Sequence, residues 1–250
     1  MNKEMTIKFH TFYTDDLPSY IPDLHKEVCN SFGYEVNYYV EKKKPKNEKE
    51  GYFYPGYREH GEFMDHVLKN SEEEVVAFLD VDCLPICKYG IQDSFDYVTE
   101  CKTFCGNAQN VSHQQNRNFI YAAASFLVVH KQAWRELGCP SMVYEEREDG
   151  MLIDTASKLT ARANQLGLDY QLYLPVGFSM EFDNPVKLGP YGWYGRGTTY
   201  YNTWHLFRVS EVHSNEKVKE LWHKTAYNIL DGSGARPKYK FYPYRLLNYF

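Results

Sequence analysis

The chain has 250 residues, which is enough for one sizeable α/β domain with its own core. Hydrophobic residues make up 43% and charged residues 24%, which excludes a disordered, collagenous or fibrous chain. The net charge of −5 provides no general attraction to nucleic acid, so we expect no nucleic-acid partner. No stretch approaches the roughly 20 apolar residues of a membrane span. No signal peptide is visible either, so we expect a cytoplasmic protein.

Aromatic residues are unusually frequent, at 17% of the chain with 23 tyrosines. Tyrosine offers a flat apolar face and a polar tip, which suits polyhydroxylated or planar ligands. Aromatic-rich usage in the lineage explains the excess equally well.

The chain has six cysteines, and four of them form two pairs with a three-residue spacer, Cys83/Cys87 and Cys101/Cys105. Structural zinc sites usually have tighter CxxC pairs, so a zinc site is the less favoured interpretation. We expect buried, reduced thiols instead.

Strand-like and helix-like segments alternate along the chain. Apolar and β-branched runs predict strands over 6–13, 34–40, 75–79, 125–129 and 170–174. Amphipathic spacing predicts helices over 17–32, 62–70, 131–137, 154–166 and 215–230. The β-α-β-α-β order at the start predicts an α/β fold with a mainly parallel sheet flanked by helices.

Two aspartates, Asp80 and Asp82, directly follow the apolar strand at 75–79. Ligands of open α/β sheets bind beyond the carboxyl ends of the strands. In extended backbone, residues two apart point to the same side, so both carboxylates would face one site. Such a pair makes an oxygen site for Mn²⁺ or Mg²⁺, an ion that ligand phosphates usually complete. A helix N-cap beside a solvated acid is the less favoured alternative.

The sequence FLDVD at 78–82 resembles the DxD motif of GT-A fold glycosyltransferases, in which a divalent ion holds a nucleotide-sugar diphosphate. The order of the chain is also similar, most of all to small viral or bacterial sugar transferases of this fold. The resemblance implies one GT-A-like (Rossmann-like) domain over 1–210, with a nucleotide-binding half over about 1–100 and an acceptor half over about 101–210. Residues 211–250 would add a helix and a tail packed on that domain. A viral member would work in the host cytoplasm.

The resemblance also implies contacts to the nucleotide. In this fold the base and ribose lie over the end of the first strand, where Tyr13 would stack on the base and Thr11 would hydrogen-bond to it. Packing and a turn explain these two residues equally well. His60 precedes the helix predicted at 62–70 and would contact the nucleotide, while Gly61 would let the backbone approach it.

Many metal-dependent members of this family add a histidine from the C-terminal part of the chain. His205 follows a glycine-rich loop and matches in order and residue type, so we expect it as the third metal ligand beside Asp80 and Asp82. A structural histidine is the alternative, because the chain has nine histidines.

Inverting members of the family place a carboxylate near a helix start as the base for the acceptor hydroxyl. We expect Asp154 in that role because Asp-Thr would open the helix predicted over 154–166, although Asp154 would also serve as its N-cap. Asp149 and Glu148 are the other candidates. The segment departs from a clean Glu-Asp motif next to the helix. Whether the transfer inverts or retains the configuration at the anomeric carbon therefore stays open.

Two further segments combine aromatic residues with glycine or with basic residues. The loop 189–201 has four glycines among aromatic residues, and we expect a mobile lid from which Arg196 would meet the diphosphate. A surface loop is the alternative. For the tail 236–245 we expect packing against the domain, with peripheral membrane contact as the second interpretation.

These features together predict a metal-dependent, hexosyltransferase-like glycosyltransferase. It would move a sugar from a nucleotide-diphosphate sugar to a glycan acceptor, with UDP as the expected nucleotide and GDP as the alternative. Nucleotidyl transfer is the rival enzyme class, but the first strand–helix turn has neither the glycine nor the lysine of a phosphate loop. A non-catalytic carbohydrate-binding protein is the other rival, and it would not need Asp80 and Asp82.

Overall fold

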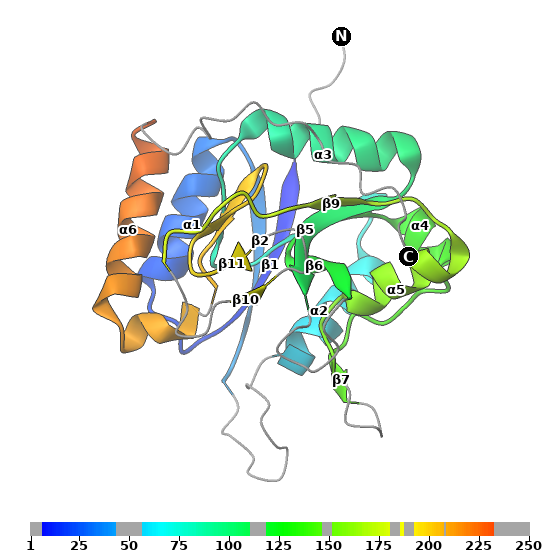
Figure 1. Cartoon of the computed structure of the whole chain (residues 1–250), viewed down its shortest axis with the longest axis horizontal. Helices are drawn as coiled ribbons and strands as arrows, with labels where there is room; N and C mark the ends of the chain where they lie inside the picture. Colours follow the sequence, from blue (N-terminus) through cyan, green and yellow to red (C-terminus); the bar gives the residue numbers. More distant parts are fainter. Residues whose placement is uncertain are drawn as a thin grey trace.

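A six-stranded sheet forms the centre of the computed structural model, in the order β2-β1-β3-β6-β5-β9 (Figure 1). β1 is parallel to β2 and β3, and β5 is parallel to β9, whereas β6 is antiparallel to β3 and β5. The strands are β1 (Lys8–Thr14), β2 (Glu35–Glu41), β3 (Val75–Leu79), β5 (Phe104–Asn110), β6 (Ile120–His130) and β9 (Gln171–Tyr173). The expected α/β fold with a mixed, mainly parallel sheet flanked by helices is therefore confirmed.

The structure describes residues 7–43, 57–110, 119–146, 152–180, 186–187, 193–207 and 209–232. Glu148, Asp149 and the tail at 236–245 lie outside these ranges.

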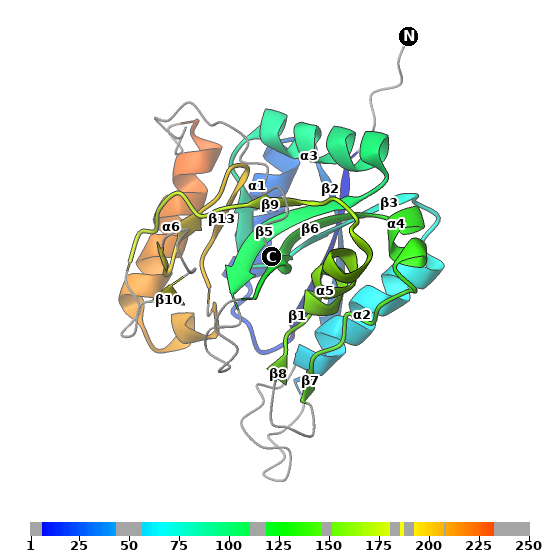
Figure 2. The same ribbon diagram turned by 45° about the vertical axis from the view of Figure 1, so that its right-hand side comes forward.

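Helices cover both faces of the sheet. On one face, Phe9 of β1 meets Phe95 of α3, and His25 of α1 meets Tyr38 of β2. On the other face, Phe78 of β3 meets α2, and Figure 2 shows α4 and α5 on the same side as α2. The helices are α1 (Tyr20–Ser31), α2 (Tyr57–Asn70), α3 (Lys88–Cys101), α4 (Lys131–Glu136), α5 (Ser157–Leu166) and α6 (Glu216–Leu230).

Short strands complete the fold beside the central sheet. β4 pairs antiparallel with β13, and β13 with β12, so a C-terminal segment is joined to the residues that follow β3. β10 pairs with β11, and β7 with β8. These elements are β4 (Cys83–Pro85), β7 (Glu145–Glu146), β8 (Leu152–Ile153), β10 (Val186–Lys187), β11 (Trp193–Tyr194), β12 (Thr198–Thr199), β13 (Thr203–His205) and the 3₁₀ helix η4 (Val209–His213).

The apolar residues of the central strands form the main core. Every residue of β6 is buried, which explains the long apolar run of that segment. A second cluster lies between α1, α6 and the β4–β13 pair, where Trp204 and Trp222 are buried with ring centroids 6.2 Å apart. In Figure 1, α6 accordingly lies alongside α1.

Three helix starts differ from the sequence prediction by three residues or more. α1 begins at Tyr20 rather than at 17. α2 begins at Tyr57 rather than at 62, so His60 and Gly61 lie inside the helix and not before it. α5 begins at Ser157 rather than at 154, because Ala156 has a left-handed conformation with a φ of 66°. A residue in this conformation interrupts a right-handed helix, so the turn at Asp154 stays separate from α5. The helix α3 and the strand β5 were not predicted.

Candidate metal and donor site

The two aspartates follow β3 in a tight turn. The backbone N–H of Cys83 donates to the carbonyl oxygen of Asp80 over 2.9 Å, and the chain then enters β4. The backbone here is a turn and not the extended segment that we expected. Both carboxylates nevertheless gather at the carboxyl end of β3, where an open α/β sheet places its ligands.

His205 reaches the aspartates because β13 pairs with β4. The register places His205 opposite Cys83, and the N–H of Leu206 donates to the carbonyl oxygen of Asp82 over 2.9 Å. The His205 Nε2 atom lies 3.2 Å from Asp82 Oδ1. A carboxylate oxygen of Asp80, one of Asp82 and a ring nitrogen of His205 all lie within 4.8 Å of one another. The structure thus brings together the three residues predicted as metal ligands.

Burial and nearby charges shift the pKa values of the two aspartates in opposite directions. Burial alone would raise the pKa of Asp82, but the charge of His205 and its hydrogen bond, together with backbone hydrogen bonds, lower the pKa below its usual value. Burial also raises the pKa of Asp80, and the charge of Asp82 adds to this, while His60 opposes it. Repulsion between two carboxylates is relieved by a bound cation.

The residue types fit a divalent ion of the Mn²⁺ kind. Two carboxylates and one imidazole suit such an ion, whereas Mg²⁺ prefers oxygen ligands alone. Within the described ranges, Nδ1 of His205 is buried and has no hydrogen-bond partner. His205 therefore has one ring nitrogen near Asp82, while the other has no hydrogen-bond partner among the residues that the structure describes.

His60 contacts Asp80 from helix α2. Its Nε2 atom lies 3.5 Å from Asp80 Oδ1, and its ring stacks on Phe12 with centroids 5.4 Å apart. Gly61 was expected to let the backbone approach a nucleotide, but a Cβ added there would lie 2.4 Å from the Cα of Val143. The glycine therefore accommodates the chain segment at Val143. A nucleotide contact of His60 stays a prediction.

Asp154 is buried in the turn before α5, with 7% of its surface exposed. Its Oδ1 accepts a hydrogen bond from the N–H of Thr155 over 2.8 Å, and its Oδ2 accepts one from the hydroxyl of Tyr121 on β6. The N-cap role expected as an alternative is wrong, because Ala156 occupies that position and no side chain caps the helix. The charge of Asp154 adds to the raised pKa of Asp80.

The other predicted donor contacts lie on two elements. Thr11 on β1 is fully buried, and its hydroxyl has no hydrogen-bond partner among the described residues. Tyr13, at the end of the same strand, is half-buried with its ring edge against Tyr38. Arg196 lies between β11 and β12 with 5% of its surface exposed. Contacts of these residues with a donor stay predictions.

The described part of the loop at 189–201 is not the mobile lid that we expected. β12 pairs with β13, the N–H of Met180 donates to the carbonyl oxygen of Arg196 over 3.0 Å, and Tyr200 is fully buried. Through these contacts the described part of the loop packs against the rest of the domain. Residues 189–192 of the loop lie outside the described ranges.

The cysteines form neither disulfides nor a metal cluster in the described residues. All six thiols are free, and Cys29, Cys83 and Cys105 are buried. Cys87 instead caps α3, since its sulfur accepts a hydrogen bond from the N–H of Gly90. Cys101 and Cys139 are exposed, which differs from the expectation of buried thiols.

Sequence reasoning missed two side chains, Tyr121, which contacts Asp154, and Asp65, which contacts the chain before it. Tyr121 stands in an apolar run and gives no local signal for its contact with Asp154. Asp65 contacts the segment at 141–142 across a long sequence separation.

Among the helices that the structure describes, none has the length and apolar character needed to cross a membrane.

No family model and no curated protein matches the chain. Among solved structures, the protein A197 from STIV is similar with a TM-score of 0.38 and 12% identity, over 63% of this chain and 78% of that one. A glycosyltransferase involved in the glycosylation of the major capsid of PBCV-1 has a TM-score of 0.33 and 18% identity, over 53% of this chain and 63% of that one. The glycosyltransferase GlyE of Streptococcus pneumoniae TIGR4 has a TM-score of 0.37 and 12% identity, over 67% of this chain and 45% of that one.

The chain thus spans less than two thirds of the length of either glycosyltransferase. Likenesses this distant assign no function to the chain, so function has to be argued from the residues of the site.

Proposed function

We propose that the chain is a metal-dependent glycosyltransferase that moves a sugar from a nucleotide-diphosphate sugar, with UDP as the nucleotide, to a glycan acceptor. The observation that carries the proposal is the convergence of Asp80, Asp82 and His205 at the carboxyl end of β3. Asp80 and Asp82 form the DxD-like segment, and a distant strand delivers the histidine.

The order of the sheet supports the same proposal. β1, β2 and β3 run parallel, so their carboxyl ends lie at the same edge of the sheet as the aspartate turn, and β6 pairs antiparallel with β3. This is the mixed, mainly parallel arrangement that the resemblance to GT-A enzymes implies. The N-terminal strands would then bind the donor, and the segments after β5 would bind the acceptor.

Each residue of the site has a separate proposed role. Asp80, Asp82 and His205 would hold a divalent ion such as Mn²⁺, and a bound ion would supply positive charge to the diphosphate leaving group. Asp154 would act as the base in an inverting transfer. It would take the proton of the acceptor hydroxyl as that oxygen bonds to the anomeric carbon and the bond to the diphosphate breaks.

A thermal-shift screen tests the proposal against its rivals. The ligands are UDP, GDP, UDP-glucose, UDP-galactose and nucleoside triphosphates, each with and without Mn²⁺. The proposal predicts that UDP and a UDP-sugar raise the melting temperature only when Mn²⁺ is present. A preference for triphosphates would favour nucleotidyl transfer, and stabilisation by sugars without metal or nucleotide would favour a carbohydrate-binding protein.

A further inference from the structure

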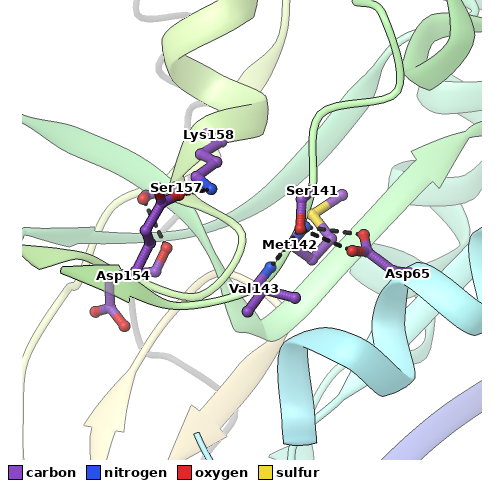
Figure 3. A network of polar contacts seen from close by, with 8 residues as sticks. Asp65, Ser141, Met142, Val143, Asp154, Ser157 and Lys158 are labelled. Atoms are coloured by element: carbon purple, nitrogen blue, oxygen red, sulfur yellow. Dashed lines mark hydrogen bonds and ion pairs between the residues drawn. The ribbon is translucent and has the colours of Figure 1, made fainter. Parts of the chain in front are cut away.

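Helix α2 contacts both parts of the proposed site. Near its start, His60 lies beside Asp80 of the proposed metal group. One turn later, Asp65 contacts the segment at 141–143, which leads toward Asp154 (Figure 3). One rigid element therefore contacts Asp80 directly and also contacts the segment that leads to Asp154.

The carboxylate of Asp65 binds this segment through both of its oxygens. Oδ2 accepts a hydrogen bond from the hydroxyl of Ser141 over 2.8 Å, and Oδ1 accepts one from the N–H of Met142 over 2.9 Å. The Ser141 hydroxyl oxygen in turn accepts a hydrogen bond from the N–H of Val143 over 3.1 Å. Hydrogen bonds to a charged acceptor are stronger than neutral ones, so this contact fixes the segment firmly.

Gly61 brings the helix against the same segment. Residues four apart lie on one face of a helix, so Gly61 and Asp65 face the segment together. A Cβ at Gly61 would lie 2.4 Å from the Cα of Val143 and 2.7 Å from the carbonyl oxygen of Met142. The two backbones are therefore in direct contact, and the segment cannot move toward α2.

The segment at 141–143 continues the connection to Asp154. The carbonyl oxygen of Met142 accepts a hydrogen bond from the N–H of Ala156 over 3.1 Å. Ala156 has a φ of 66°, a left-handed conformation that residues with a Cβ rarely adopt. Such a conformation persists only where the surrounding structure imposes it. The N–H and the hydroxyl of Ser157 both donate to the carbonyl oxygen of Asp154, over 3.0 and 2.6 Å.

We propose that Asp65 is a positioning residue that holds the carboxylate of Asp154 in place through Ser141, Met142 and the left-handed turn at Ala156. This inference rests on the proposed function, in which Asp154 is the base. Loss of the Asp65 contact frees Met142, which removes the partner of the Ala156 N–H and lets the turn at 154–157 relax. Small misplacement of a catalytic group lowers turnover by on the order of 10- to 100-fold without weakening the donor site.

The first test is amide hydrogen exchange on the full chain without ligand. Asp65→Asn keeps the size of the side chain and removes its charge. We expect faster exchange in the peptides that contain 141–143 and 152–157, and unchanged exchange in β3. The matched control is Asp96→Asn on α3, whose exposed carboxylate accepts a hydrogen bond from the side-chain amide of Gln92 on the same helix. Unchanged exchange at 152–157 in Asp65→Asn would overturn the inference.

The second test is a double-mutant cycle on transfer from UDP-glucose or UDP-galactose to methyl glycosides. If Asp65 acts through Asp154, Asp65→Asn lowers kcat in the parent and has no further effect in an Asp154→Asn background. The KM for the donor stays the same. Equal losses of kcat in both backgrounds would show that Asp65 acts elsewhere.

The cycle also separates this inference from the proposed function. Full turnover in Asp154→Asn alone would remove the base role and the positioning role with it. A large loss in Asp154→Asn together with an inert Asp65→Asn would leave the proposed function standing and refute the inference. A lower melting temperature with unchanged kcat per folded molecule would assign Asp65 to stability alone.

Discussion

The Nε2 atom of His205 lies 3.2 Å from Oδ1 of Asp82, although the two residues lie far apart in the sequence. The contact exists because β13 folds back onto β4, immediately after the aspartate turn. A structural histidine would also be satisfied by this contact, so the question is whether His205 binds a metal ion.

We expect His205→Ala to weaken Mn²⁺-supported binding of UDP by roughly 10- to 100-fold, because the ion would lose a ligand. Isothermal titration of UDP at fixed Mn²⁺ measures this change. His66→Ala is the control, since His66 is exposed and contacts Asn70 of its own helix. An unchanged affinity over a Mn²⁺ titration would make His205 a structural histidine.

We expect Asp154→Asn to lower turnover by about 10²- to 10⁴-fold, the usual contribution of a general base. Asn keeps an oxygen for one of the two hydrogen bonds that Asp154 accepts from Thr155 and Tyr121, so the melting temperature should change little. Donor binding should persist, because the diphosphate would be held at Asp80 and Asp82. Retained activity per folded molecule would turn the search to Glu148 and Asp149.

We expect Gly61→Ala to destabilise the protein, although the same change in an open helix usually stabilises it by about 1 kcal/mol. The new Cβ would lie 2.4 Å from the Cα of Val143, so the backbones must separate. The expected loss is about 1–3 kcal/mol, typical of overpacking. Gly177→Ala is the control, since a Cβ there meets nothing within 4 Å. Denaturant titration measures both variants, and a more stable Gly61→Ala would contradict the close contact.

We expect His10 to make the protein less stable as pH falls. Burial is the main cause that lowers the pKa of His10 to about 4, against 6.5 for an ordinary histidine. Between these values the unfolded chain binds a proton that the folded chain does not, so folding stability decreases from pH 6.5 to 4. The stability lost at His10 is on the order of 3 kcal/mol.

His10→Gln isolates this contribution. Denaturant titrations at several pH values should show a flatter dependence between pH 4 and 6.5 in the variant than in the parent. Identical slopes would mean that His10 takes up its proton as readily in the folded protein as in the unfolded chain. The carboxylate of Glu73, 3.8 Å away, would then stabilise the charged ring.

The aspartate turn could be predicted because its signal is local. Five apolar residues mark β3 as a buried strand, and such a strand places the following Asp80 and Asp82 at a ligand-binding edge. His205 could be predicted only through the order of the family motif. Its contact depends on the pairing of β4 with β13, and no local pattern near His205 specifies that pairing.

The glycine-rich loop shows why part of the prediction was wrong. Glycines indicated mobility, but a Cβ at Gly195 would lie 2.4 Å from the carbonyl oxygen of Met180, and one at Gly197 would lie 2.8 Å from the Ser179 hydroxyl. These glycines permit close packing. Close approach of distant segments also explains Gly61 inside α2 and the contacts of Asp65 and Tyr121, which sequence patterns of one segment do not reveal.

The central claim is that Asp80, Asp82 and His205 bind a divalent ion together with a nucleotide diphosphate. Electron paramagnetic resonance tests it directly, because the signal of free Mn²⁺ decreases when the ion binds. Mn²⁺ is titrated into the parent and into Asp82→Ala, each with and without UDP. We predict that the parent removes the free signal, more strongly with UDP, and that Asp82→Ala does neither while keeping its fold by circular dichroism. Equal Mn²⁺ binding by both proteins would contradict the account.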